Sequence, residues 1–166
     1  MEERAAPASA GLITTRAEFH AAVRAAFAEA AQKGCREIWL CDVDFADWPL
    51  GERAVVEHLT QWAESHRRLT LLAQSFDEVP RRHARWVEWR RTWSHVVQCR
   101  TNPELEAGQM PTLMLTEGLA SIRMVDPIHY RGRLSHDVAE ALHCRETIDA
   151  VLQRSIETFP VSTTGL

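Results

Sequence analysis

Two aspartates with one residue between them follow the first apolar, strand-like run of the chain. Asp42 and Asp44 come at the end of the run 37–43, and Asp47 lies three residues further on. Carboxylate oxygens are the ligands that Mg²⁺ and Ca²⁺ prefer, and ligands of parallel α/β sheets tend to lie beyond the carboxyl ends of the strands. The alternative is that these aspartates form a turn and cap a helix. We favour the turn and keep Asp42 and Asp44 as candidate binding residues.

Arginine and tryptophan share the segment 80–94, the most distinctive part of the chain. Trp86, Trp89 and Trp93 recur at helical spacing and predict a stripe packed on a sheet. The arginines then occupy the solvated sides, where their forked donors suit a phosphate, a nucleic acid or the acidic surface of a partner protein. The candidate binding residues of this segment are Arg81, Arg82, His83, Arg85 and Arg90, of which the histidine contributes only if a pocket forms beside it.

The spacing of the histidines and cysteines does not predict a metal site, a disulfide or a cofactor. No H-E-x-x-H or H-x-x-x-H occurs among the eight histidines. The four cysteines contain no C-x-x-C pair, which predicts four free thiols; they are Cys35, Cys41, Cys99 and Cys144. The chain also lacks a serine nucleophile elbow, a phosphate-cradling loop and a dinucleotide-binding motif.

The elements that must position these residues alternate in type along the first two thirds of the chain. Thr15 and Glu18 form a capping box that starts a helix at 15–33, and Gly34 ends it. Apolar strand-like runs at 37–43, 69–73 and 96–100 alternate with amphipathic helices, the last of them 80–94. This order predicts a largely parallel sheet with right-handed crossovers.

The pattern changes after residue 111. Runs at 112–116 and 119–125, separated by Glu117 and Gly118, predict a β-hairpin. A polar stretch follows at 126–137. Residues 139–144 are either a strand or the start of a helix at Asp137, and a helix at 145–159 closes the fold. We therefore expect one α/β domain at 15–160 with a mixed sheet flanked by helices, a flexible lead-in at 1–14 and a tail at 161–166.

The order of parallel strands, hairpin and closing helix resembles one half of the phospholipase D-like fold. The resemblance covers about 15–160 and is closest to small bacterial proteins and appended domains that are degenerate members of that scaffold. Active members carry an H-x-K-x-x-x-x-D motif followed by glycine, in which the histidine attacks phosphorus. With Glu117-Gly118 aligned on the family's Asp-Gly turn, Met110 stands at the histidine position and Thr112 at the lysine position. Neither can perform that chemistry, so the resemblance implies a scaffold without its catalysis.

Composition and charge restrict the partners. The net charge of −4 argues against generic nucleic-acid binding, and no apolar run is long enough to predict a membrane span. The acidic start of the chain does not look like a secretory signal, which predicts a cytoplasmic protein. The resemblance implies a homodimer, because half-units of that fold commonly pair.

We therefore expect a non-catalytic binding module that recognises a protein or a phosphate-containing ligand through the arginine-rich segment or the vacated active-site groove. Two alternatives stay open. One is a divergent phosphoryl-handling enzyme that uses Asp42, Asp44 and a metal ion. The other is a weak nucleic-acid binder.

Overall fold

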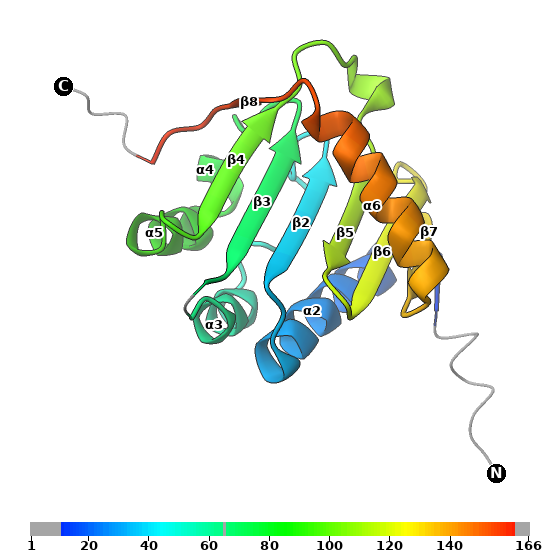
Figure 1. Cartoon of the computed structure of the whole chain (residues 1–166), viewed down its shortest axis with the longest axis horizontal. Coiled ribbons are helices and arrows are strands. Elements are labelled where there is room, and N and C mark those ends of the chain that lie inside the picture. Colours follow the sequence, from blue (N-terminus) through cyan, green and yellow to red (C-terminus); the bar gives the residue numbers. More distant parts are fainter. Residues whose placement is uncertain (1–10, 65, 162–166) are drawn as a thin grey trace.

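Eight strands form one mixed sheet in the computed structural model, which describes residues 11–64 and 66–161 (Figure 1). The strands are β1 (Leu12–Ile13), β2 (Glu37–Asp42), β3 (Arg68–Ala73), β4 (Val97–Thr101), β5 (Thr112–Thr116), β6 (Ala120–Asp126), β7 (Arg131–Ser135) and β8 (Ile156–Glu157). Their order in the sheet is β1-β7-β6-β5-β2-β3-β4-β8. The expected single α/β domain with a mixed sheet flanked by helices is confirmed.

The prediction of a largely parallel sheet is wrong. β3 runs parallel to both of its neighbours, β2 and β4. Every other neighbouring pair of the described strands is antiparallel. The reason is that the hairpin joins the sheet beside β2 and continues into β7, and short strands close both edges.

Helices cover the two faces of the sheet unequally. They are α2 (Arg16–Lys33), α3 (Arg53–Trp62), α4 (Val79–Arg82), α5 (Ala84–Thr92) and α6 (Val138–Leu152). The alternation of side chains along β2 sends Ile38 and Leu40 into the core beneath α2, α3 and α5, and Trp39 and Cys41 into a second core beneath α6. In Figure 1, α6 crosses β5 and β6, while β3 and β4 have no helix on that side.

Helix α2 is set by its ends, as its sequence predicts. The Thr15 hydroxyl accepts a hydrogen bond from the backbone N–H of Glu18 at 3.1 Å. The Glu18 carboxylate accepts from the backbone of Thr14 rather than Thr15, at 2.7 Å, so the capping box closes one residue earlier than expected. Gly34 follows the helix with a φ of +80°, a conformation that favours glycine.

The arginine-rich segment is two helices rather than the one expected at 80–94. α4 and α5 meet at His83, whose backbone has a φ of −130° and a ψ of 50° and is therefore not helical. The reason is tertiary. The His83 ring is buried and bonds to the backbone of Phe45 and Gly51, and these bonds hold the residue between the two helices.

The carboxyl-terminal third contains the predicted hairpin and shows whether residues 139–144 form a strand or a helix. Residues 139–144 are helical, and the Asp137 carboxylate caps α6 by accepting from the backbone N–H of Glu140 at 3.3 Å. The helix ends at Leu152 rather than 159, after which β8 pairs with the end of β4. Strand β7 lies inside the stretch predicted as a polar loop and pairs with β6 and β1. β1 itself lies in the predicted lead-in, while residues 1–10 and 162–166 fall outside the described part.

Candidate functional site

Asp42 and Asp44 hold the loop that follows β2. The Asp42 carboxylate accepts from the backbone N–H of Phe45 at 2.8 Å and from the Thr112 hydroxyl at 2.6 Å. Asp44 accepts from the backbone N–H of Ala46 at 3.0 Å. These bonds are those of turn-forming aspartates. Within residues 11–64 and 66–161, no group of three or more His, Cys, Asp or Glu side chains is placed to hold a metal ion.

The expected vacated groove is filled. Met110, at the position of the family's histidine, is 5% exposed, and Thr112, at the position of the lysine, is 4% exposed. The cavity beside Thr112 and Asp42 measures about 40 Å³. Ligand pockets for small molecules typically measure ~300–1,000 Å³. The cavity beside Asp42 is therefore too small for a substrate. A separate pocket of about 470 Å³ lies further along the same edge, beyond the ends of β3 and β4, and does not include Asp42 or Thr112.

The arginines of α4 and the start of α5 are engaged within the chain. Arg81 and Arg82 both pair with the Glu78 carboxylate, at 2.7 and 3.0 Å. Arg85 donates to the backbone carbonyl of Gly51 at 2.7 Å. These contacts fix neighbouring segments to each other, so the structure does not gather the candidate arginines into one binding surface.

His83 and Arg90 are buried. The Nδ1 atom of His83 accepts from the Gly51 backbone N–H at 3.2 Å, so Nε2 carries the proton and donates to the Phe45 carbonyl at 2.7 Å. Burial lowers the pKa of His83 and keeps the ring neutral. Arg90 is 5% exposed, and its guanidinium lies 4.8 Å from the centroid of the Phe159 ring. Both residues serve packing.

The four cysteines are free thiols, as predicted. Cys41, Cys99 and Cys144 are buried. Burial raises the pKa of the Cys99 thiol to about 12, which keeps it protonated near neutral pH.

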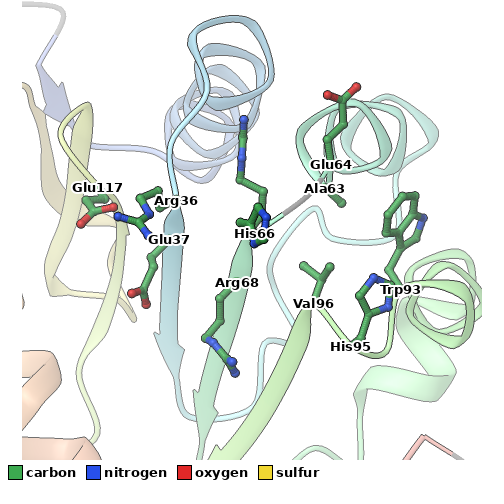
Figure 2. Close-up of a pocket in the computed structure, with 11 residues that line it drawn as sticks. Arg36, Glu37, Ala63, Glu64, His66, Arg68, Trp93, His95, Val96 and Glu117 are labelled. Atoms are coloured by element: carbon green, nitrogen blue, oxygen red, sulfur yellow. The ribbon is translucent and has the colours of Figure 1, made fainter.

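The largest pocket described lies at the opposite end of the sheet from Asp42. It measures about 780 Å³ and opens at the amino ends of β2, β3 and β4, beside the turn between β5 and β6 (Figure 2). We call it the amino-edge pocket. It is lined by Arg36, Glu37, Ala63, Glu64, His66, Arg67, Arg68, Trp93, His95, Val96 and Glu117. None of the seven candidate binding residues is among them; Trp93 and Glu117, which the sequence singled out for a packed stripe and a turn, both line it.

Five charged side chains of the amino-edge pocket have no ion-pair partner among the described residues. Among the contacts of the described residues, no ion pair joins Arg36 or Arg68 to a carboxylate, and none involves Glu37, Glu64 or Glu117. Figure 2 shows these side chains along one edge of the sheet. Charged groups that have no ion-pair partner among residues 11–64 and 66–161 are the candidates for contact with a ligand.

Arg67 is the exception among the three arginines of this pocket. Its guanidinium donates to the carbonyl of Trp62 at the end of α3, at 3.2 Å. The same group lies against Gly34 at the end of α2. A cation between the carboxyl ends of two helices is favourable because those ends carry partial negative charge. Arg67 therefore holds the two helix ends together.

An aromatic stack forms the far wall of the pocket. The rings of Trp93 and His95 stack with centroids 5.9 Å apart, and Trp93 stacks in turn on Trp89 at 6.4 Å. Trp89 contacts Trp86 in the core at 6.3 Å. The predicted tryptophan stripe on the sheet is therefore confirmed, and it also fixes the orientation of Trp93 at the pocket.

A weak signal for this pocket was present in the sequence. Charged or aromatic residues stand just before each parallel strand: Arg36 before β2, Arg67 before β3, and Trp93 and His95 before β4. The amino ends of parallel strands meet at one edge of a sheet, so these residues had to come together. The general tendency of ligands to bind at the carboxyl ends of parallel strands instead predicts a site at the opposite edge, beside Asp42 and Asp44.

No helix in the described ranges is long and apolar enough to cross a membrane.

Comparison with known proteins shows a fold and no family. No family model matches the sequence, and no curated protein matches it. Among solved structures, the fold is similar to that of TrmBL2, an archaeal chromatin protein whose structure shows a novel mode of DNA binding. The TM-score is 0.62 at 10% sequence identity over 89% of this chain and 53% of that one. The chain thus spans about half the length of that protein, and at this identity the likeness shows the fold alone.

Proposed function

We propose that this chain is a non-catalytic binding module whose ligand occupies the amino-edge pocket. The observation that carries the proposal is that five charged side chains without ion-pair partners among the described residues line a pocket of about 780 Å³. That volume lies within the range of small-molecule sites. The candidate arginines are instead engaged elsewhere: Arg81 and Arg82 pair with Glu78, Arg85 donates to the Gly51 carbonyl and Arg90 is buried.

The absence of catalysis belongs to the same proposal. We infer that the scaffold is a degenerate phospholipase D-like half-unit whose histidine and lysine positions are taken by Met110 and Thr112. Both residues are buried, which supports a packing role. The alternative enzyme that uses Asp42 and Asp44 would need free carboxylate oxygens, whereas both carboxylates accept hydrogen bonds from the loop backbone.

We also propose that the chain forms a homodimer in which the exposed side of α6 is the contact. Val138 and Leu142 lie four residues apart on this helix and are 81% and 59% exposed. Residues at this spacing share one face of a helix. Burial of such a pair against a second copy would remove apolar surface from water.

Thermal shift tests the binding function. Wild-type protein is heated with a chemically varied set of compounds: phosphate, nucleotides, amino acids, polyamines, dicarboxylates and Mg²⁺. A compound that binds only the folded state raises Tm in proportion to the logarithm of its concentration. We expect at least one compound to do so in the wild type and to lose its effect in Arg68→Ala, while a phosphodiester substrate is not hydrolysed. Arg133→Ala, at an exposed strand residue outside the pocket, is the control. Turnover, or a Tm shift that Arg68→Ala leaves intact for every compound, contradicts the proposal.

A second candidate function is nucleic-acid binding, which the likeness to a DNA-binding chromatin protein favours. The net charge of −4 argues against it. The test is affinity for short duplex DNA as a function of salt. Contacts to phosphates make the logarithm of the binding constant fall linearly with the logarithm of salt concentration. Absence of binding at low salt removes this candidate.

A further inference from the structure

We infer that Phe159 gates a second binding site, in which Arg90 binds a phosphate or carboxylate that enters from the pocket of about 470 Å³ beyond β3 and β4. We call this cavity the carboxyl-edge pocket. It goes beyond the proposed function, because it lies at the opposite edge of the sheet from the amino-edge pocket and shares no lining residue with it. Three features support the inference: the unpaired charge of Arg90, the ring that covers this charge, and the weak attachment of the segment that carries the ring.

Arg90 is a buried charge without a charged partner. Its side chain is 5% exposed, and no ion pair within residues 11–64 and 66–161 joins it to a carboxylate. Its Nε atom is buried and has no hydrogen-bond partner there. Burial raises the pKa of the Cys99 thiol to about 12, which the charge of Arg90 opposes only in part, so this thiol stays neutral. Because removal of a charge from water is unfavourable, buried charges are normally paired. The packing of Arg90 thus leaves a guanidinium that a bound anion would stabilise.

The ring of Phe159 covers this guanidinium. The Cζ atom of Arg90 lies 4.8 Å from the ring centroid, and the ring stacks on Phe76 with the two centroids 5.4 Å apart. An aromatic face attracts a cation but does not neutralise it. Phe76 and Phe159 both line the carboxyl-edge pocket, whereas Arg90 does not. Phe159 therefore contacts both the guanidinium and the pocket, and displacement of its side chain joins the two.

The segment that carries Phe159 is held by few contacts. We call residues 156–161 the strap. Within it, β8 pairs with β4 at two positions, and the backbone N–H of Thr158 donates to a carbonyl of β4 at 3.0 Å. Phe159 has a φ of +52°, which is unfavourable for a residue other than glycine. Arg100 binds Ser155 at 2.7 and 2.8 Å, so the strap is anchored immediately before its first residue. In Figure 1, the red segment crosses the end of β4 and continues towards α4 and α5. Such a segment can open locally while the rest of the fold stays intact.

The carboxyl-edge pocket suits an anion only when Arg90 joins it. Neither arginine nor lysine is among the described residues that line it, and Asp77 contributes a carboxylate, so the closed pocket does not attract an anion. The Ser75 hydroxyl accepts from the backbone N–H of Asp77 at 3.1 Å, which leaves its own hydrogen to donate to a ligand. The forked donors of an arginine fit the oxygens of a phosphate or a carboxylate. Ligands of parallel sheets tend to lie at this edge.

The position of the strap then sets the affinity. A ligand that requires a minor conformation binds more weakly in proportion to the fraction of molecules that adopt it. Such minor conformations commonly make up ~0.1–10% of the molecules. Phe159→Ala removes the ring and with it this requirement, so the variant should bind the anion at least about tenfold more tightly than the wild type.

Isothermal titration of the full chain with inorganic phosphate and with acetate tests the inference. We expect Phe159→Ala to bind at least one of these probes at least about tenfold more tightly than the wild type, and the stronger probe identifies the ligand as a phosphate or a carboxylate. Addition of Arg90→Met to this variant should remove the binding. Ile156→Ala, which shortens an exposed side chain of the strap outside the pocket, is the control and should bind as the wild type does. Arg90→Met alone should not lower Tm, because an apolar side chain in place of an unpaired buried charge is often neutral or stabilising.

The outcomes separate this site from the amino-edge pocket. Equal affinity of Phe159→Ala and the wild type for both probes, or no binding to either, overturns the inference, and this comparison holds even if Arg90→Met does not fold. Binding that persists without Arg90 overturns it as well, because the anion then lies elsewhere. Loss of the binding when Arg68→Ala is added to Phe159→Ala assigns the anion to the amino-edge pocket, which overturns the inference and supports the proposed function. Failure of every compound in the thermal-shift set contradicts the proposed function and leaves this site standing.

Discussion

His83 joins two points of the loop after β2 and so connects the start of α5 to that loop. One ring nitrogen accepts from Gly51 and the other donates to Phe45. Only the neutral ring can do both, since protonation would turn the acceptor into a donor. Burial lowers the pKa of His83, so the unfolded chain takes up this proton at a higher pH than the folded chain does. Its contribution to stability is complete above the ordinary histidine pKa of about 6.5 and declines as the pH falls below it.

Substitution of His83 should therefore change both the stability and its pH dependence. We expect His83→Gln to lose about 1–3 kcal/mol at neutral pH, because it leaves a buried backbone group unpaired. The loss of stability between about pH 7.5 and 5.5 should also be smaller in the variant than in the wild type. Urea denaturation at both pH values measures the two effects. His143→Gln, at an exposed position of α6, is the control. Equal pH dependence in wild type and His83→Gln would contradict this role.

Gly132 allows strand β7 to pair closely with β6, although the sequence around it predicts a polar loop. The pairing of the strands shifts register between Met124 and Asp126, which marks an irregularity such as a bulge. Gly132 lies opposite Met124, and a Cβ atom there would approach the Arg123 carbonyl to 2.5 Å. Close contact between the two backbones therefore requires glycine at this position.

Gly132→Ala should destabilise the protein by about 1–3 kcal/mol, as overpacking does. The clash is with backbone, which cannot move aside as a flexible side chain can. Gly108→Ala is the matched control, because a Cβ atom there meets no other atom within 4 Å. Chemical denaturation of both variants measures the difference. Equal stability of the two would show that the strands can separate without cost.

At the scale of the whole molecule, the two faces of the sheet differ in what covers them. Of the helices in the described part of the chain, α2, α3, α4 and α5 lie on one face, and α6 covers part of the other (Figure 1). α6 also exposes apolar side chains, with Val138 and Leu142 on one side of the helix. A second copy is the partner that we propose for this surface.

The proposed homodimer predicts a mass near twice 18.9 kDa by light scattering. Leu142→Lys should shift the mass towards that of one chain, because it places a charge in the apolar contact. Ile128→Lys is the control, since Ile128 is 80% exposed in the turn between β6 and β7 and is not part of α6. A mass of one chain at all concentrations contradicts the homodimer. Dissociation by both variants contradicts the assignment of α6.

The sequence by itself determined the elements whose signals are local. The capping residue Thr15, the apolar runs of the parallel strands and the turn at Glu117-Gly118 depend on neighbouring residues, and the predictions made from them are confirmed. The free thiols and the tryptophan stripe follow equally from type and spacing. The tertiary structure decided the break at His83, strand β7 and the antiparallel character of the sheet. These depend on contacts between segments far apart in the chain, which local patterns do not record.

For the candidate site, too, the sequence gives the chemical types of the residues, and the tertiary structure decides which of them have partners. The sequence identified residues by chemical type, and the fold then paired Arg81 and Arg82 with Glu78, buried Arg90 and tied Asp42 into a turn. It gathered Arg36, Glu64, Arg68 and Trp93 from the three segments that lead into β2, β3 and β4 instead. A charged residue is available to a ligand only if no nearer partner neutralises it, and the nearest partner is set by the packing of the whole chain.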